Sequence, residues 1–202
     1  MNRATARRML SSYVEEPVAS WLARVGVSPN AVTLFGLVGA GVSAYLLGIG
    51  LLWAGGVALL AAGALDLFDG ALARVTDRVS KFGALLDSVV DRLSEIAVLL
   101  GLLVFYLSSS STLGVLLVYL ALAGSIMVSY LRARAEGLGI ECRIGFMTRP
   151  ERVVALGVGT IIGHFSAIVL LIVLGAIAGL TMLTMVQRIY HTWRTVNVDG
   201  TE

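Results

Sequence analysis

Four aspartates in one short segment are the residues of this chain best placed to do chemistry. Asp66 and Asp69 lie three residues apart, and Asp87 and Asp91 lie four residues apart further along the chain. On a helix, either spacing puts both side chains on one face. The connection between the pairs (residues 75–81) is short, so we expect two antiparallel neighbouring helices whose carboxylates converge.

Carboxylates gathered in this way repel one another and are costly to bury, so we expect cations between them. Oxygen ligands without His or Cys favour Mg²⁺ or Mn²⁺ over zinc. Four carboxylates suit two metal ions about 3.5–4 Å apart, an arrangement that stabilises the attacking and leaving oxygens at phosphorus. Gly70, Ala73 and Gly83 leave the helix surfaces bare beside the acids, and Arg74 offers a fork for phosphate oxygens. Simple pairing of the acids with nearby arginines, or an ion-transport path, is the alternative.

The composition predicts that a membrane surrounds this cluster. Of 202 residues, 57% are hydrophobic and 14% are charged, and the mean hydropathy is +0.89. A soluble domain of this length needs more charge on its surface. The net charge of +2 argues against a nucleic-acid partner, and Cys142, the single cysteine, excludes a disulfide framework.

Three uncharged stretches define the expected architecture: residues 25–65, 96–131 and 153–187. Each is roughly 35–40 residues long, whereas one span needs about 20, so each suits a hairpin of two helices. The expected helices are 31–49, 52–75, 83–107, 111–135, 150–163 and 166–190. We therefore predict an all-α integral membrane protein with six transmembrane helices, forming a single domain over residues 1–202 with its bundle at 31–190.

The distribution of charge predicts the orientation of the bundle. Six spans place all 15 Lys and Arg residues at or beside one face, which the positive-inside rule makes cytoplasmic, with both termini inside. Residues 4–24 mix apolar side chains with Arg and Glu, which predicts an amphipathic juxtamembrane helix broken or started by Pro17. We expect a multi-pass protein of the cell (inner) membrane whose aspartates lie at the cytoplasmic face.

The spacing D-x-x-D-G-x-x-A-R-x8-G-x3-D-x3-D resembles the signature of the CDP-alcohol phosphatidyltransferases. Every fixed position of that signature is met, by Asp66, Asp69, Gly70, Ala73, Arg74, Gly83, Asp87 and Asp91. The resemblance implies an enzyme of phospholipid biosynthesis that moves a phosphatidyl group from CDP-diacylglycerol to a small alcohol and releases CMP. It also implies a six-helix fold and a homodimer.

The same resemblance assigns roles to individual residues. Asp66, Asp69, Asp87 and Asp91 would hold two metal ions, Mg²⁺ or Mn²⁺, and Asp91 would also be the general base. Contacts with the CDP-lipid would come from Pro29, Asn30, Ala31, Val32, Gly70, Ala73, Arg74 and Ser80. No convincing Ser, Cys or His nucleophile accompanies the cluster, so we expect direct displacement at phosphorus rather than a covalent intermediate.

Three further arginines from separate helix ends predict the binding of an anionic acceptor. Arg132, Arg152 and Arg188 meet the same face as the aspartates, and arginine binds phosphate in a bidentate way. Ordinary positive-inside flanking charge is the alternative for any one of them.

The segments around these arginines, 129–136, 149–152 and 187–188, resemble those of bacterial, mycobacterial-type phosphatidylinositol phosphate synthases. By that match the three arginines would hold the phosphate of inositol 1-phosphate. Two positions depart from the pattern. The resembled synthases usually have Lys where this chain has Arg132, and an acidic residue where it has Thr148. Glycerol 3-phosphate, giving phosphatidylglycerol phosphate, stays open as the acceptor. So do an ether-linked CDP-archaeol donor and, from another class of protein, a metal-ion transporter.

Overall fold

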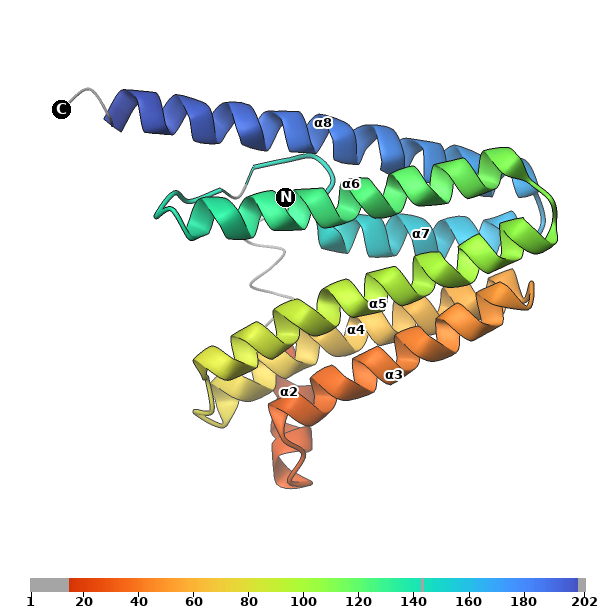
Figure 1. The fold of residues 1–202 in the computed structure, drawn as a ribbon. Coiled ribbons are helices and arrows are strands. Elements are labelled where there is room, and N and C mark those ends of the chain that lie inside the picture. The colour runs from red at the N-terminus through yellow and green to blue at the C-terminus, as the bar shows by residue number, and fades with distance from the viewer. Residues whose placement is uncertain (1–14, 143, 200–202) are drawn as a thin grey trace, which may run out of the picture.

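The computed structural model describes residues 15–142 and 144–199, and within these ranges it contains seven helices and no strand (Figure 1). The helices are α2 (Glu16–Arg24), α3 (Pro29–Gly48), α4 (Leu52–Val75), α5 (Lys81–Ser108), α6 (Thr112–Glu136), α7 (Arg149–Gly163) and α8 (Ala167–Asp199). The all-α prediction is therefore confirmed for the described part of the chain.

The breaks within the three uncharged stretches lie where the sequence predicts them. Gly50, with φ of 85°, separates α3 from α4, because glycine adopts positive φ without steric cost. Ser110 lies between α5 and α6, and α7 ends at Gly163 before α8 begins. The predicted end of the last helix at residue 190 is wrong. Residues 188–199 contain neither Gly nor Pro, so α8 continues to Asp199.

The structure describes only residues 15–24 of the predicted juxtamembrane helix 4–24, and residues 4–14 lie outside the described part of the chain. Pro17 stands in the first turn of α2, which agrees with its predicted role as a helix start. Ala19 is fully buried while Trp21 is 61% exposed, so this helix has the two faces that the sequence predicts. Its buried face packs against α4, where Ala19 forms a small apolar cluster with Val32, Ala71 and Leu72.

Two groups of three helices make up the bundle. In the first group, α3 packs extensively against both α4 and α5, so the aspartate-bearing helices are held together mainly through α3. In the second group, α8 packs against α6 and α7. The groups meet where α4 contacts α7 and where α5 contacts α6. Figure 1 shows the α4–α5 turn and the C-terminal ends of α6 and α8 at one end of the bundle, opposite the connections α3–α4, α5–α6 and α7–α8.

Small residues allow the helices to approach at the level of the backbone. A Cβ atom on Gly101 would lie 2.2 Å from the Ala44 carbonyl oxygen, so glycine is required where α5 crosses α3. A Cβ atom on Gly56 would lie 2.6 Å from the Gly157 carbonyl oxygen, where α4 crosses α7. These crossings fix α4 and α5 relative to their neighbours, and hence fix the positions of the aspartates.

Four helices are long and apolar enough to cross a membrane: α3, α4, α6 and, over residues 167–197, α8. The remaining two long helices differ for visible reasons. Helix α7 has 15 residues, and α5 carries five charged side chains between its start and Glu95: Lys81, Asp87, Asp91, Arg92 and Glu95. The chain thus has the apolar helices of a membrane protein, and the count of six spans stays a prediction.

Candidate active site

Asp69 is the most deeply held of the four aspartates. It lies on α4 and is 6% exposed. Its carboxylate accepts hydrogen bonds from Thr33 Oγ1 at 2.7 Å and from the Gly70 backbone N–H at 2.6 Å. Thr33 belongs to the second turn of α3, so the packing of α3 on α4 orients this carboxylate. Outer contacts of this kind orient the carboxylates of metal sites.

Asp66 lies one turn before Asp69 and faces the centre of the bundle. A Cβ atom on Gly36 would lie 2.9 Å from Asp66 Oδ1, so the absence of a side chain at that position of α3 makes room for the carboxylate. The other oxygen, Oδ2, accepts a hydrogen bond of 2.5 Å from the Arg149 guanidinium at the start of α7. Helices α3, α4 and α7 therefore define the position of Asp66 together.

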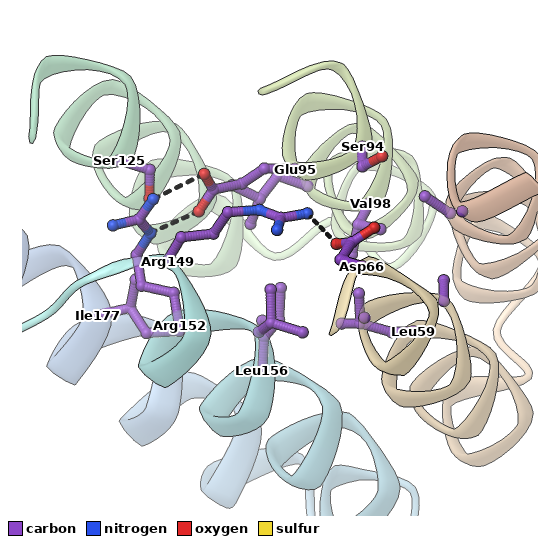
Figure 2. Close-up of a pocket in the computed structure, with 16 residues that line it drawn as sticks. Leu59, Asp66, Ser94, Glu95, Val98, Ser125, Arg149, Arg152, Leu156 and Ile177 are labelled. Carbon is purple, nitrogen blue, oxygen red and sulfur yellow. Dashed lines mark hydrogen bonds and ion pairs between the residues drawn. The ribbon is translucent and has the colours of Figure 1, made fainter. Parts of the chain in front are cut away.

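Asp87 and Asp91 lie on consecutive turns of α5, and both are partly buried. Asp91 Oδ1 lies 2.9 Å from Arg149 Nη1, an ion pair whose side chains are 19% and 24% exposed. Because the same guanidinium also binds Asp66, one arginine of α7 connects the two aspartate-bearing helices. Figure 2 shows its contact with Asp66.

The donor chemistry of this centre fits divalent cations. Two carboxylates from different helices already converge on a single positive group, and the predicted donors are all oxygens. As the side chains stand, however, no three His, Cys, Asp or Glu residues of the described chain form a group that could hold a metal ion. The guanidinium of Arg149 lies between Asp66 and Asp91 instead. The assignment of the four aspartates to metal ions stays a prediction.

The three arginines expected to bind the acceptor line one cavity of about 90 Å³. Its other lining residues are Asp91, Arg92, Glu95, Val128, Ser129, Thr148 and Arg149. The structure thus brings Arg132, Arg152 and Arg188, from α6, α7 and α8, next to the proposed base Asp91. Basic groups from three helices around one cavity form a suitable surface for a phosphate.

Each of the three arginines is held differently. Arg152 is 2% exposed and binds both carboxylate oxygens of Glu95, at 2.5 Å and 2.8 Å, as well as the Met147 carbonyl oxygen. Arg188 is 3% exposed and donates to the carbonyl oxygens of Ile144 and Val128.

Arg132 is the accessible member of the set. Its side chain is 49% exposed and pairs with Glu136 one turn later on α6, at 2.9 Å. Two arginines are therefore fixed by the protein, and one is free to adjust to a ligand.

The residues expected to contact the CDP-lipid gather at helix starts and along α4. Ser80 caps α5 by accepting a hydrogen bond of 2.9 Å from Gly83 N, and Asn30 Oδ1 also lies close to Gly83. The start of α3, with Pro29, Asn30, Ala31 and Val32, thus adjoins the start of α5, although the Val32 side chain is buried in the apolar cluster with α2 and α4.

On α4, Arg74 follows Gly70 and Ala73 and is largely exposed, with Glu15 at 3.5 Å as its ion-pair partner. A backbone surface without bulky side chains therefore lies beside an accessible guanidinium. That arrangement is compatible with the predicted contact to a diphosphate.

Four residues with clear positions in the site had no role in the sequence analysis: Thr33, Gly36, Glu95 and Arg149. Glu95 follows Asp91 by four residues, so the helical stripe of Asp87 and Asp91 could have been extended to it. Arg149 precedes Arg152 by three residues and shares its helix face. Thr33 and Gly36 carry no such signal, since their roles depend on where α3 packs.

The sequence profile of the CDP-alcohol phosphatidyltransferases matches residues 26–196, and the chain belongs to this family. It is therefore a phosphatidyltransferase that acts on CDP-linked alcohols. The chain is 35% identical over 186 residues to the archaetidylinositol phosphate synthase of Methanothermobacter thermautotrophicus, an alignment that covers 89% of this chain and 88% of the relative.

Solved structures of the phosphatidylinositol phosphate synthase of Mycobacterium tuberculosis have the same fold. The structure with CDP-DAG bound superposes with a TM-score of 0.83 at 32% identity, covering 90% of this chain and 94% of the other. The structure in complex with manganese and citrate gives a TM-score of 0.83 at 33% identity, with 89% of each chain covered.

Proposed function

We propose that this enzyme transfers a phosphatidyl group from CDP-diacylglycerol to inositol 1-phosphate, giving phosphatidylinositol phosphate and CMP. The observation that carries the proposal is the cavity in which Arg132, Arg152 and Arg188 adjoin Asp91. An acceptor with a phosphate would be held by the arginines and would present its hydroxyl to the carboxylate. The likeness to enzymes named archaetidylinositol phosphate synthase and phosphatidylinositol phosphate synthase supports the same choice.

The proposed metal ligands are Asp66, Asp69, Asp87 and Asp91, with two Mg²⁺ ions per active site and Mn²⁺ as a substitute. Bound there, such ions would neutralise the diphosphate and make CMP a better leaving group. The manganese in the related M. tuberculosis structure supports the use of divalent metal.

The side chains of the protein would supply the remaining chemistry. Asp91 takes the proton of the acceptor hydroxyl while that oxygen attacks the lipid-bearing phosphorus. One P–O bond forms, the P–O bond to CMP breaks, and CMP leaves with the electron pair. Arg74, beside Gly70 and Ala73, would hold the diphosphate of the donor. Ser80 and the start of α3 (residues 29–32) would contact the CDP part of the donor.

A membrane position follows from the same proposal. We infer six transmembrane helices, both termini in the cytoplasm, one domain over residues 1–202 and an active site at the cytoplasmic face of the inner membrane. The positive-inside distribution of Lys and Arg supports this orientation. The acyl chains of the donor would stay in the bilayer, and the homodimer implied by the family resemblance stays a prediction.

Glycerol 3-phosphate is the second candidate acceptor, since it also brings a phosphate to three arginines. An ether-linked donor is a second candidate for the lipid, in view of the likeness to an archaetidylinositol phosphate synthase. Membership of an enzyme family decides against the metal-ion transporter.

The test supplies purified protein and Mg²⁺ with CDP-diacylglycerol and, in parallel, inositol 1-phosphate, glycerol 3-phosphate or serine. Release of CMP with the matching lipid product identifies the acceptor, and preference for inositol 1-phosphate is expected. A higher kcat/KM with glycerol 3-phosphate would replace the proposal by the second candidate. Repeating the assay with CDP-archaeol decides the donor lipid.

A further inference from the structure

Arg149 is the group in the active site whose position the proposed reaction does not explain. It opens α7, yet its guanidinium reaches between the aspartate-bearing helices, 2.5 Å from Asp66 Oδ2 and 2.9 Å from Asp91 Oδ1. Figure 2 shows the side chain extending from α7 toward Asp66 on α4. A positive group therefore lies between two of the carboxylates assigned to divalent cations.

The fit of this guanidinium is incomplete. Arg149 Nε is buried without a hydrogen-bond partner, and Asp91 Oδ1 makes no hydrogen bond despite its closeness to Nη1. A structural arginine–carboxylate pair in a low-dielectric site usually satisfies its donors and acceptors, because buried unpaired groups are costly. The arrangement neutralises charge but leaves hydrogen bonds unmade, as expected for a cation that exchanges with another.

Arg149 also borders two separate spaces. One is a small interior cavity of about 30 Å³, which Asp66 and Glu95 line as well. The other is the arginine-lined cavity with Arg132, Arg152 and Arg188. The Arg149 side chain therefore already borders the proposed phosphate site while its guanidinium lies between the carboxylates.

Neither of two other arginines near the aspartates is placed to do this. Arg92 donates to the Ser88 carbonyl oxygen of its own helix. Arg74 is 62% exposed and pairs with Glu15, the N-cap residue of α2. Arg149 contacts carboxylates of both α4 and α5.

We propose that Arg149 is the resident counter-cation of the metal-free centre, which a divalent ion displaces, and that the released guanidinium joins the phosphate site. Metal loading and phosphate binding are then positively coupled through one side chain. The idea rests on the proposed metal centre. By linkage, phosphate must raise metal affinity by the same factor as metal raises phosphate affinity.

The first test measures Mn²⁺ binding to the detergent-solubilised full chain by electron paramagnetic resonance, together with the thermal midpoint in EDTA and in Mn²⁺. Arg149→Gln is expected to bind Mn²⁺ about tenfold more tightly, a change within the usual range for coupling between sites. It should also lower the thermal midpoint in EDTA more than in Mn²⁺. Arg134→Gln removes an exposed arginine from the same end of the bundle and should change neither value.

Arg149→Lys tests whether the two-sided contact of the guanidinium matters, since lysine keeps the positive charge but cannot span both Asp66 and Asp91. Its Mn²⁺ affinity should lie between those of the wild type and Arg149→Gln, and it serves as the test if Arg149→Gln does not fold. Wild-type Mn²⁺ affinity in both Arg149 variants would overturn the proposal.

The second test repeats the Mn²⁺ titration with inorganic phosphate as the probe. In the wild type, phosphate should raise Mn²⁺ affinity several-fold. In Arg149→Gln the ratio of the Mn²⁺ affinities with and without phosphate should be close to one. An equal gain in both proteins would overturn the coupling. Absence of phosphate binding to the wild type would instead remove the proposed acceptor site, while the counter-cation role would still be decided by the Mn²⁺ affinities alone.

Discussion

Arg152 and Glu95 form a buried two-point ion pair between α7 and α5. Nε and Nη2 of the arginine lie 2.5 Å and 2.8 Å from the two carboxylate oxygens, and the side chains are 3% and 10% exposed (Figure 2). The pair fixes the guanidinium at the wall of the proposed phosphate site. It also joins the two groups of helices beside the aspartates.

Breaking this pair should destabilise the protein far more than breaking the exposed pair of Arg132 and Glu136 on α6. Glu95→Gln leaves a buried arginine charge without its partner, and we expect a loss of about 3 kcal/mol. The matched control Glu136→Gln, which frees half-exposed Arg132, should cost about 0.3–0.5 kcal/mol. Thermal unfolding of both variants in detergent measures the contrast. Equal thermal midpoints in the two variants would show that the buried pair stabilises the protein no more than the exposed pair does.

Asp91→Asn tests the proposed base. Loss of a general base typically lowers the rate by about 10²–10⁴-fold, so CMP release should fall by that order while CDP-lipid binding persists. Asp77→Asn is the control, because Asp77 is an exposed turn residue with φ of 52°, a conformation that asparagine tolerates. Unchanged turnover in Asp91→Asn would remove the base assignment.

The helices were predictable from the sequence because charge and apolar length mark their ends directly. The segment 52–75 was predicted with the bounds that α4 has, since Gly50 and the charged turn after Val75 bracket it. The end of α8 was missed, because charged residues were taken to end the helix as well as the span. They end only the apolar part, and the backbone continues as a helix to Asp199.

The site was only partly predictable, since its residues come from six helices. The chain spacing reveals Asp66 and Asp69 as one face and Asp87 and Asp91 as another. It does not reveal that Thr33 binds Asp69, because this contact depends on the packing of α3 against α4. The metal and substrate roles themselves stay predictions.

Thr33→Val should weaken the metal centre without changing the shape of the side chain. The hydrogen bond to Asp69 is lost, and loss of such orienting contacts typically lowers metal affinity about 10–100-fold. The Mg²⁺ concentration for half-maximal CMP release measures the effect. Thr160→Val is the control, since Thr160 is also buried but donates its hydrogen bond to the Gly157 carbonyl oxygen of its own helix. Equal Mg²⁺ requirements in the two variants would contradict the role of Thr33.

Gly36→Ala should displace Asp66. The new Cβ atom would lie 2.9 Å from Asp66 Oδ1, and the carboxylate, being the end of a flexible side chain, is the group that yields. A displacement on the order of 1 Å in an active site can lower the rate by about 10²-fold. Gly41→Ala on the same helix meets no atom within 4 Å and should leave kcat unchanged. Equal kcat in both variants would show that Asp66 does not need this space.

Arg132→Gln tests the acceptor site most cleanly, because Arg132 is exposed and its removal leaves no buried partner. The KM for inositol 1-phosphate should rise about tenfold, the effect of one lost charged hydrogen bond, while the thermal midpoint stays constant. The rise should be smaller for serine, which has no phosphate. Arg134→Gln removes an exposed charge two residues away on α6 and should leave the KM unaltered. A similar rise with serine, or with Arg134→Gln, would mean that general charge at this face, rather than a phosphate site, governs acceptor binding.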